Sequence, residues 1–140
     1  MKVTIHHAEG DESAEVIEVE GELDASTYEA LIEAAKTICA SGPRNILIDL
    51  SNVNFMASSG LVALHSVALL ARGAEPPDPT AGWNALRAVS SDINHGYEKR
   101  VKLLNPQPRV RKTLEMTGFA DFLEIFDDRE AAMASFGSTD

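Results

Sequence analysis

The segment that most constrains the fold is "RNILIDL", residues 44–50, which is apolar almost without interruption. A strand with one wet face alternates apolar and polar residues, whereas a strand covered by helices on both faces does not. The segment therefore predicts a central strand of an α/β sheet. The 140 residues of the chain suit one domain with a single core.

The segments on either side support a layered α/β arrangement. Residues 2–6 and 14–21 flank a polar turn region, which predicts an N-terminal β-hairpin. The rest of the chain alternates strands and helices, as in a small sheet of βα units with helices packed on it. The expected helices are 26–42, 58–71, 108–118 and 127–136, and the expected later strands are 44–50, 101–105 and 121–126.

Residues 72–100 interrupt this alternation with three prolines and several glycines. Loops of this length are uncommon in compact domains. Trp83, Leu86 and Val89 fit one face of a short helix inside the segment. We therefore expect a single domain over 1–140 that carries an insertion at about 72–100.

The charge balance narrows the choice of partners. The chain has 22 acidic and 12 basic residues and a formal net charge of -10, so its surface repels nucleic acid and anionic membranes. The N-terminus lacks the apolar core of a signal peptide, and no apolar run is long enough to insert into a bilayer. Cys39 is the one cysteine, so no intrachain disulfide can form. These features predict a cytoplasmic protein.

Residue types that support catalysis do not form a known pattern. The four histidines, His6, His7, His65 and His95, have no second ligand at metal spacing. No G-x-x-x-x-G-K or G-x-G-x-x-G loop is present to hold a phosphate. Met56 stands where the hydrolase motif G-x-S-x-G has its first glycine. We expect no enzymatic activity, no cofactor and no metal.

Two adjacent serines, Ser58 and Ser59, stand where the helix 58–71 begins. Serine is among the best N-cap residues, so one of the two would cap this helix, and Ser26 or Thr27 would cap the helix 26–42. A cap uses one serine, however, and leaves the second without a role.

A phosphate on Ser58 or Ser59 is a second interpretation. Helix N-termini tolerate phosphate, and the modification would bring a charge of about -1.5 to -2 onto an apolar rim of Phe55, Met56 and Leu61. Such a charge would switch off an interface without unfolding the domain. The residues alone favour the interpretation of the serines as a helix cap, and they leave the phosphorylation switch as an alternative.

Two separated segments resemble the motifs of STAS domains. "VEGELDASTYEAL" is similar to the G-x-L-D-x-x-T segment after the second strand of that family, and "ILIDLSNVNFMASSGLVAL" is similar to its D-L-S-x-V-x-F-M-D-S-S-G-L segment. "LLNPQPRVRKTLEMTGFADFLEIFDD" resembles the tail of the family. The similarity covers the chain except 72–100, and it implies a single STAS-type domain of the bacterial anti-sigma factor antagonist branch.

The resemblance implies a regulatory role. Members of that branch bind an anti-sigma factor, which is also a serine kinase, and thereby release a sigma factor. Phosphorylation of the first serine breaks the complex, and a serine phosphatase resets the cycle. Carried over to this chain, Ser58 is the phosphoacceptor. The residues implied around it on the partner-binding surface are Asp24, Thr27, Met56, Ser59 and Gly60.

Two departures from the family pattern qualify this implication. Ala57 replaces the aspartate before the serines, which removes a carboxylate that could cap the helix or meet the kinase. Phosphorylation could therefore be weakened while binding survives. The insertion at 72–100 stands where relatives usually have a short turn.

Three other classes stay open. Similar domains assemble into large stress-signalling scaffolds, and STAS domains also serve as soluble accessory subunits of transporters. An enzyme is the least favoured class, since it would need a serine, a histidine and an acid to converge in space. The sequence leaves the oligomeric state, the sigma factor and the kinase undetermined.

Overall fold

The computed structural model describes residues 2–8, 13–40, 42, 44–73 and 98–137 of the chain. The strands are β1 (Lys2–Ala8), β2 (Ala14–Leu23), β3 (Ile46–Met56), β4 (Val101–Leu104) and β5 (Glu124–Phe126). The helices are α1 (Tyr28–Ile38), α2 (Ser58–Ala71), α4 (Pro108–Met116) and α5 (Arg129–Gly137), with a short 3-10 helix, η2 (Phe119–Asp121).

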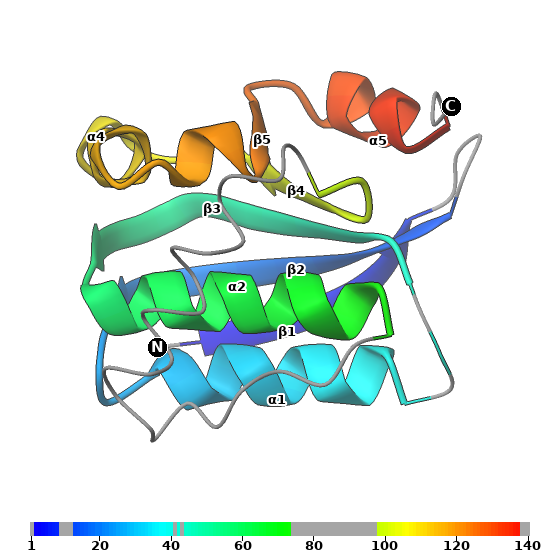
Figure 1. Cartoon of the computed structure of the whole chain (residues 1–140), viewed down its shortest axis with the longest axis horizontal. Helices are drawn as coiled ribbons and strands as arrows, with labels where there is room; N and C mark the ends of the chain where they lie inside the picture. Colours follow the sequence, from blue (N-terminus) through cyan, green and yellow to red (C-terminus); the bar gives the residue numbers. More distant parts are fainter. Residues whose placement is uncertain (1, 9–12, 41, 43, 74–97, 138–140) are drawn as a thin grey trace.

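The five strands form one mixed sheet in the order β1-β2-β3-β4-β5. β1 and β2 are an antiparallel hairpin, and β2 to β5 run parallel to one another. Helices α1 and α2 lie side by side against one face of the sheet, whereas α5 lies on the other side (Figure 1). The predicted α/β class, the N-terminal hairpin and the helices packed on the sheet are confirmed.

The apolar run at the start of β3 is buried on both faces. Ile46, Leu47, Ile48 and Leu50 are all 0% exposed. The Leu47 side chain packs in the cluster beneath α5, while the other three belong to the cluster shared with α1 and α2. Burial on both faces of the sheet therefore explains, as predicted, why apolar and polar residues do not alternate in this segment.

The β3 strand continues six residues past its predicted end at Leu50. The segment after Leu50 is mixed in polarity, so it reads as a turn, but it pairs with β2 as far as the contact between Leu23 and Met56. Two irregularities of register occur along this part of the pairing. Strand length is set here by the neighbouring strand and not by an apolar run.

The C-terminal elements differ in two details from the sequence-based prediction, which also expected Val110, Leu114 and Thr117 to face the core. The expected strand 121–126 shortens to β5, because the preceding residues form η2 and place Phe122 and Leu123 in the core. On α4, Val110 and Leu114 are buried, whereas Thr117 after its end is exposed. The Thr117 hydroxyl donates to the carbonyl of Thr113 instead, over 2.7 Å.

Residues 74–97 of the expected insertion, with the helix predicted at Trp83, Leu86 and Val89, lie outside the described residues. An ion pair joins the two flanks of this segment. Arg72 Nη1 lies 3.5 Å from Glu98 Oε2, and the side chain of Glu98 is 8% exposed. Within the described ranges, no helix has both the length and the apolar character needed to cross a membrane.

Candidate functional site

The two segments that carry the family resemblance meet at the carboxyl ends of β2 and β3 (Figure 1). Leu23 and Met56 are the last register pair of the two parallel strands. One residue further on, the backbone N–H of Ala57 donates to the carbonyl oxygen of Leu23 over 2.9 Å. The loop from β2 to α1 and the start of α2 are therefore held against each other by the sheet and by this bond.

Gly60 explains why α2 approaches the sheet so closely. A Cβ atom at this position would stand 2.8 Å from Met56 Cγ, 2.9 Å from the Leu23 carbonyl oxygen and 3.0 Å from Leu23 Cγ. Only a residue without a side chain fits there. The absence of a side chain at Gly60 therefore permits the close approach of α2 to the ends of β2 and β3.

The loop between β2 and α1 is closed by its own polar side chains. The Thr27 hydroxyl donates to the carbonyl of Glu22 over 2.7 Å and accepts the backbone N–H of Asp24 over 3.0 Å. Asp24 Oδ1 accepts the backbone N–H of Ser26 over 2.9 Å and its hydroxyl over 2.8 Å. The loop thus has a defined shape before any partner arrives.

These contacts also set the charge of the loop. The Ser26 hydroxyl and then the Ser26 backbone N–H hold the pKa of Asp24 below its ordinary value. A hydrogen bond that favours the charged form of a carboxylate always acts in this direction. Asp24 therefore presents a stable negative charge beside the start of α1.

The predicted caps are wrong at α2 and only partly right at α1. Ala57 occupies the N-cap of α2 in an extended conformation, with φ -92 and ψ 175, and no side chain caps the helix. Ser58 and Ser59 are its first two residues. At α1 Thr27 does hold the N-cap position, but its hydroxyl bonds back to the loop and not to the helix.

The surface at the start of α2 is small and mixed in character. Ser58 is exposed and Ser59 is half-buried. Phe55 is 43% exposed, whereas Met56 and Leu61 are 5% and 6% exposed and belong to the core. Of the three residues expected to form an apolar rim, the structure leaves Phe55 as the one at the surface.

The six residues predicted for the site fall into three groups. Ser58 and Ser59 lie at or near the surface of α2, and Asp24 and Thr27 form the half-buried neighbouring loop. The last two, Met56 and Gly60, are buried beneath this surface.

Sequence reasoning did not find Leu23, and it gave Ser26 only as a possible cap of the helix 26–42. The Leu23 carbonyl anchors Ala57, and Ser26 fixes the carboxylate of Asp24. The D-x-S spacing of Asp24 and Ser26 was a usable signal, because Asp side chains often bond the backbone two residues on. Leu23 acts through its backbone carbonyl, which every residue has, so the type of its side chain could not have indicated this role.

Comparison with protein families places residues 6–76 in a family described as "Mlab, STAS domain". This match spans both motif segments and more than half of the chain. No sequence among curated proteins matches the chain.

Solved structures of low sequence identity share the fold. An anti-sigma factor antagonist from Mycobacterium paratuberculosis has a TM-score of 0.61 at 23% identity, over 96% of this chain and 94% of that chain. The anti-sigma factor antagonist SpoIIAA, in its unphosphorylated form, has a TM-score of 0.57 at 22% identity, over 98% of this chain and 100% of that chain. A protein from Thermotoga maritima has a TM-score of 0.61 at 18% identity, over 96% and 93%.

Proposed function

Because the chain belongs to the STAS domain family, we propose that it acts as an anti-sigma factor antagonist. In this proposal it binds an anti-sigma factor that is also a serine kinase, and a sigma factor is released. Phosphorylation of Ser58 ends the complex, and a serine phosphatase restores it. The residues 1–140 are proposed to be one STAS domain, with 72–100 inserted after α2.

The position of Ser58 is the observation that supports this proposal most. Its side chain is exposed on the first turn of α2. The preceding residue, Ala57, is held to Leu23 by a backbone hydrogen bond. A kinase can therefore reach the hydroxyl, while the backbone beneath it is fixed. The positive end of the helix dipole at the start of α2 favours an added phosphate.

The switch would act on the surface and leave the fold intact. A phosphate on Ser58 adds a charge of about -1.5 to -2 to the surface at the start of α2, three positions after the exposed aromatic residue Phe55. Aromatic side chains are frequent anchors of protein interfaces, and a charge beside an anchor must be desolvated when a partner binds. Asp24 already holds one negative charge on the neighbouring loop. Binding should therefore weaken after phosphorylation.

The experiment that tests this proposal measures affinity for a cognate anti-sigma factor with serine kinase activity. Ser58→Glu should weaken binding by at least about tenfold, as expected for a charge at an interface, while Ser58→Ala should bind like the native chain. Ser13→Glu is the matched control, because Ser13 is exposed at the opposite end of β2. Equal affinity of both Ser58 variants would exclude the switch.

Ala57 gives a second, narrower hypothesis about phosphorylation. The family aspartate is missing, so the kinase has lost a carboxylate that it could recognise next to Ser58. The chain would then be a constitutive binder. Incubation with the kinase and ATP, followed by intact mass measurement, decides between the two. A gain of one phosphate on Ser58 would reject the constitutive binder.

A further inference from the structure

Within the part of the chain that the structure describes, the outer side of β1 is the long unpaired edge of the sheet. β1 stands first in the strand order and, among the described residues, pairs with β2 alone. An edge strand presents a row of backbone N–H and C=O groups that can pair with another chain. The opposite edge, β5, has 3 residues, whereas β1 has 7.

Apart from the exposed Lys2 at its start, β1 lacks the devices that usually protect an edge. It contains no proline, and its register with β2 runs without a bulge from Lys2 opposite Glu20 to Ala8 opposite Ala14. Ile5, at the centre of the strand, is 38% exposed. Natural edge strands are normally short, bulged, charged or covered, because a flat apolar edge invites pairing.

The charge of β1 is compatible with a copy of itself as the partner. The chain has 22 acidic residues and a net charge of -10, but β1 contains no Asp or Glu. Two copies that met along this strand would therefore oppose no carboxylate of β1.

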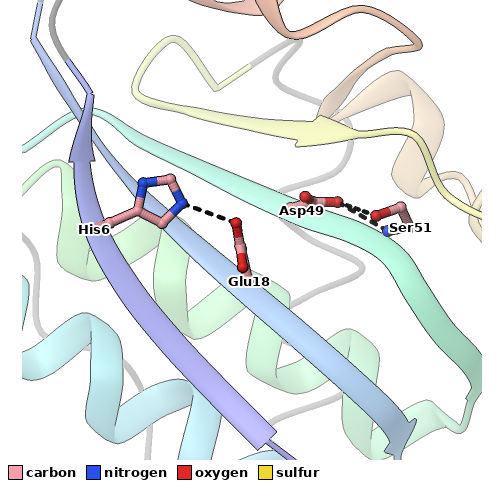
Figure 2. Close-up of polar contacts among 4 residues, drawn as sticks. All are labelled: His6, Glu18, Asp49 and Ser51. Carbon is pink, nitrogen blue, oxygen red and sulfur yellow. Dashed lines mark hydrogen bonds and ion pairs between the residues drawn. The ribbon is translucent and has the colours of Figure 1, made fainter.

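The histidines of β1 are held by its own sheet. His6 Nε2 lies 2.9 Å from Glu18 Oε1, and His7 Nδ1 lies 2.7 Å from Glu15 Oε1. Figure 2 shows the His6 ring turned toward Glu18 on β2, across the face of the sheet and not beyond its edge. These side chains therefore leave the backbone of β1 open to a neighbour.

We propose that β1 pairs with β1 of a second copy, antiparallel about a two-fold axis at Ile5. The two Ile5 side chains then lie directly opposite each other and lose their exposure to water. Thr4 of each copy faces His6 of the other, and Lys2 faces Ala8, so no like charges are opposed. Every contact occurs twice, as in any isologous dimer, and the two sheets become one continuous sheet.

Disulfide trapping tests this register directly. Residues opposite each other in antiparallel strands have Cα atoms about 4.5 or 5.5 Å apart, and both separations allow a disulfide. In a Cys39→Ser background, Ile5→Cys should therefore form a covalent dimer in air at high yield. Met116→Cys, at a residue 76% exposed on α4, is the control and should give little dimer. Equal yields from the two variants, or none from Ile5→Cys, would overturn the proposal.

Sedimentation equilibrium of the full chain tests the dimer without a cross-link. The native chain should dimerise with rising concentration, Ile5→Lys should stay monomeric, and Met116→Lys, which changes the charge equally, should dimerise like the native chain. A native chain that stays monomeric throughout, or an Ile5→Lys variant that dimerises normally, would contradict the pairing. Circular dichroism checks that Ile5→Lys is folded; if it is not, the trapping result decides.

Discussion

The backbone N–H of Ala57 donates to the carbonyl oxygen of Leu23 over 2.9 Å, and this bond joins the ends of two parallel strands. Leu23 leads into the loop of Asp24, and Ala57 leads into the helix of Ser58. Leu23 and Met56 are 33 positions apart in the sequence, but they are partners in the register of β2 and β3. The two motifs that contain them are therefore adjacent in space. Their proximity follows from the parallel pairing of β2 with β3 and needs no direct contact between the motif side chains.

Gly60→Ala should destabilise the fold, although alanine usually favours a helix over glycine by about 1 kcal/mol. The new Cβ would stand 2.8 Å from Met56 Cγ and 2.9 Å from the Leu23 carbonyl oxygen, and the backbone atom cannot move aside easily. Overpacking of this kind costs about 1–3 kcal/mol. Urea denaturation should show a lower free energy of unfolding.

Ser58→Ala is the control for the Gly60 experiment, since it changes the same helical turn at an exposed side chain. Its free energy of unfolding should stay close to the native value. A Gly60→Ala variant that is as stable as the native chain would show that α2 can shift away from Leu23.

Ala57→Asn should stabilise the protein by about 1 kcal/mol, the usual gain from a side-chain N-cap. Ala57 already has the extended backbone of an N-cap residue, with ψ 175, but it offers no acceptor. Ala57→Asp should add the same cap and also a favourable charge at the helix N-terminus. Urea unfolding at low and high salt separates the two effects, because salt screens the charge alone. Ala57→Val is the control without an acceptor, and stabilisation by it would exclude capping as the cause.

The pattern of apolar and polar residues along the sequence made most of the fold predictable. The run Ile46 to Leu50 indicated a strand covered on both faces, and the structure leaves none of its apolar side chains exposed. The helix expected at 58–71 matches α2 at both ends, because its apolar residues are buried almost all round. β3 was predicted too short, since a strand beyond Leu50 depends on pairing with β2 and not on its own residues.

The candidate site was predictable as a place but not as a set of contacts. The family resemblance implied that Asp24 lies near Ser58, and the strand register brings their two segments together at the carboxyl ends of β2 and β3. The N-cap was misplaced by one residue because serine is a better cap than alanine, and the choice of Ala57 comes from where β3 ends. The burial of Met56 also depends on α2, which the local sequence does not encode.

The hydrogen bonds of Ser26 make the charge of Asp24 testable by titration. The Ser26 hydroxyl is the largest cause of the lowered pKa of Asp24, and the Ser26 backbone N–H is the second. Ser26→Ala removes the first and keeps the second, so the pKa of Asp24 should rise but stay below its ordinary value. Carboxyl NMR titration measures this shift. An unchanged pKa would show that the hydroxyl does not hold the carboxylate in solution.

The same pKa shift predicts how stability depends on acid. A carboxyl group whose pKa is lower in the folded state stabilises the fold at pH values above its unfolded pKa of about 3.9. This contribution is lost as the pH falls through the lower, folded pKa of Asp24. Asp24→Asn should therefore reduce the loss of stability between neutral and acidic pH. Urea unfolding at both pH values measures the difference, with Asp121→Asn as the control at an exposed aspartate on η2.

Cys39 should react slowly with alkylating reagents, because burial raises the pKa of its thiol against an opposing effect of Arg44. The thiolate is the reactive form, so at about pH 8 the folded chain should be alkylated by iodoacetamide more slowly than the same chain in urea. Arg44→Gln removes the opposing positive charge and should slow the reaction further in the folded state only. Arg109→Gln, an exposed arginine on α4, is the matched control and should leave the rate unchanged. A folded chain that reacts as fast as the unfolded one would show that the thiol is not desolvated.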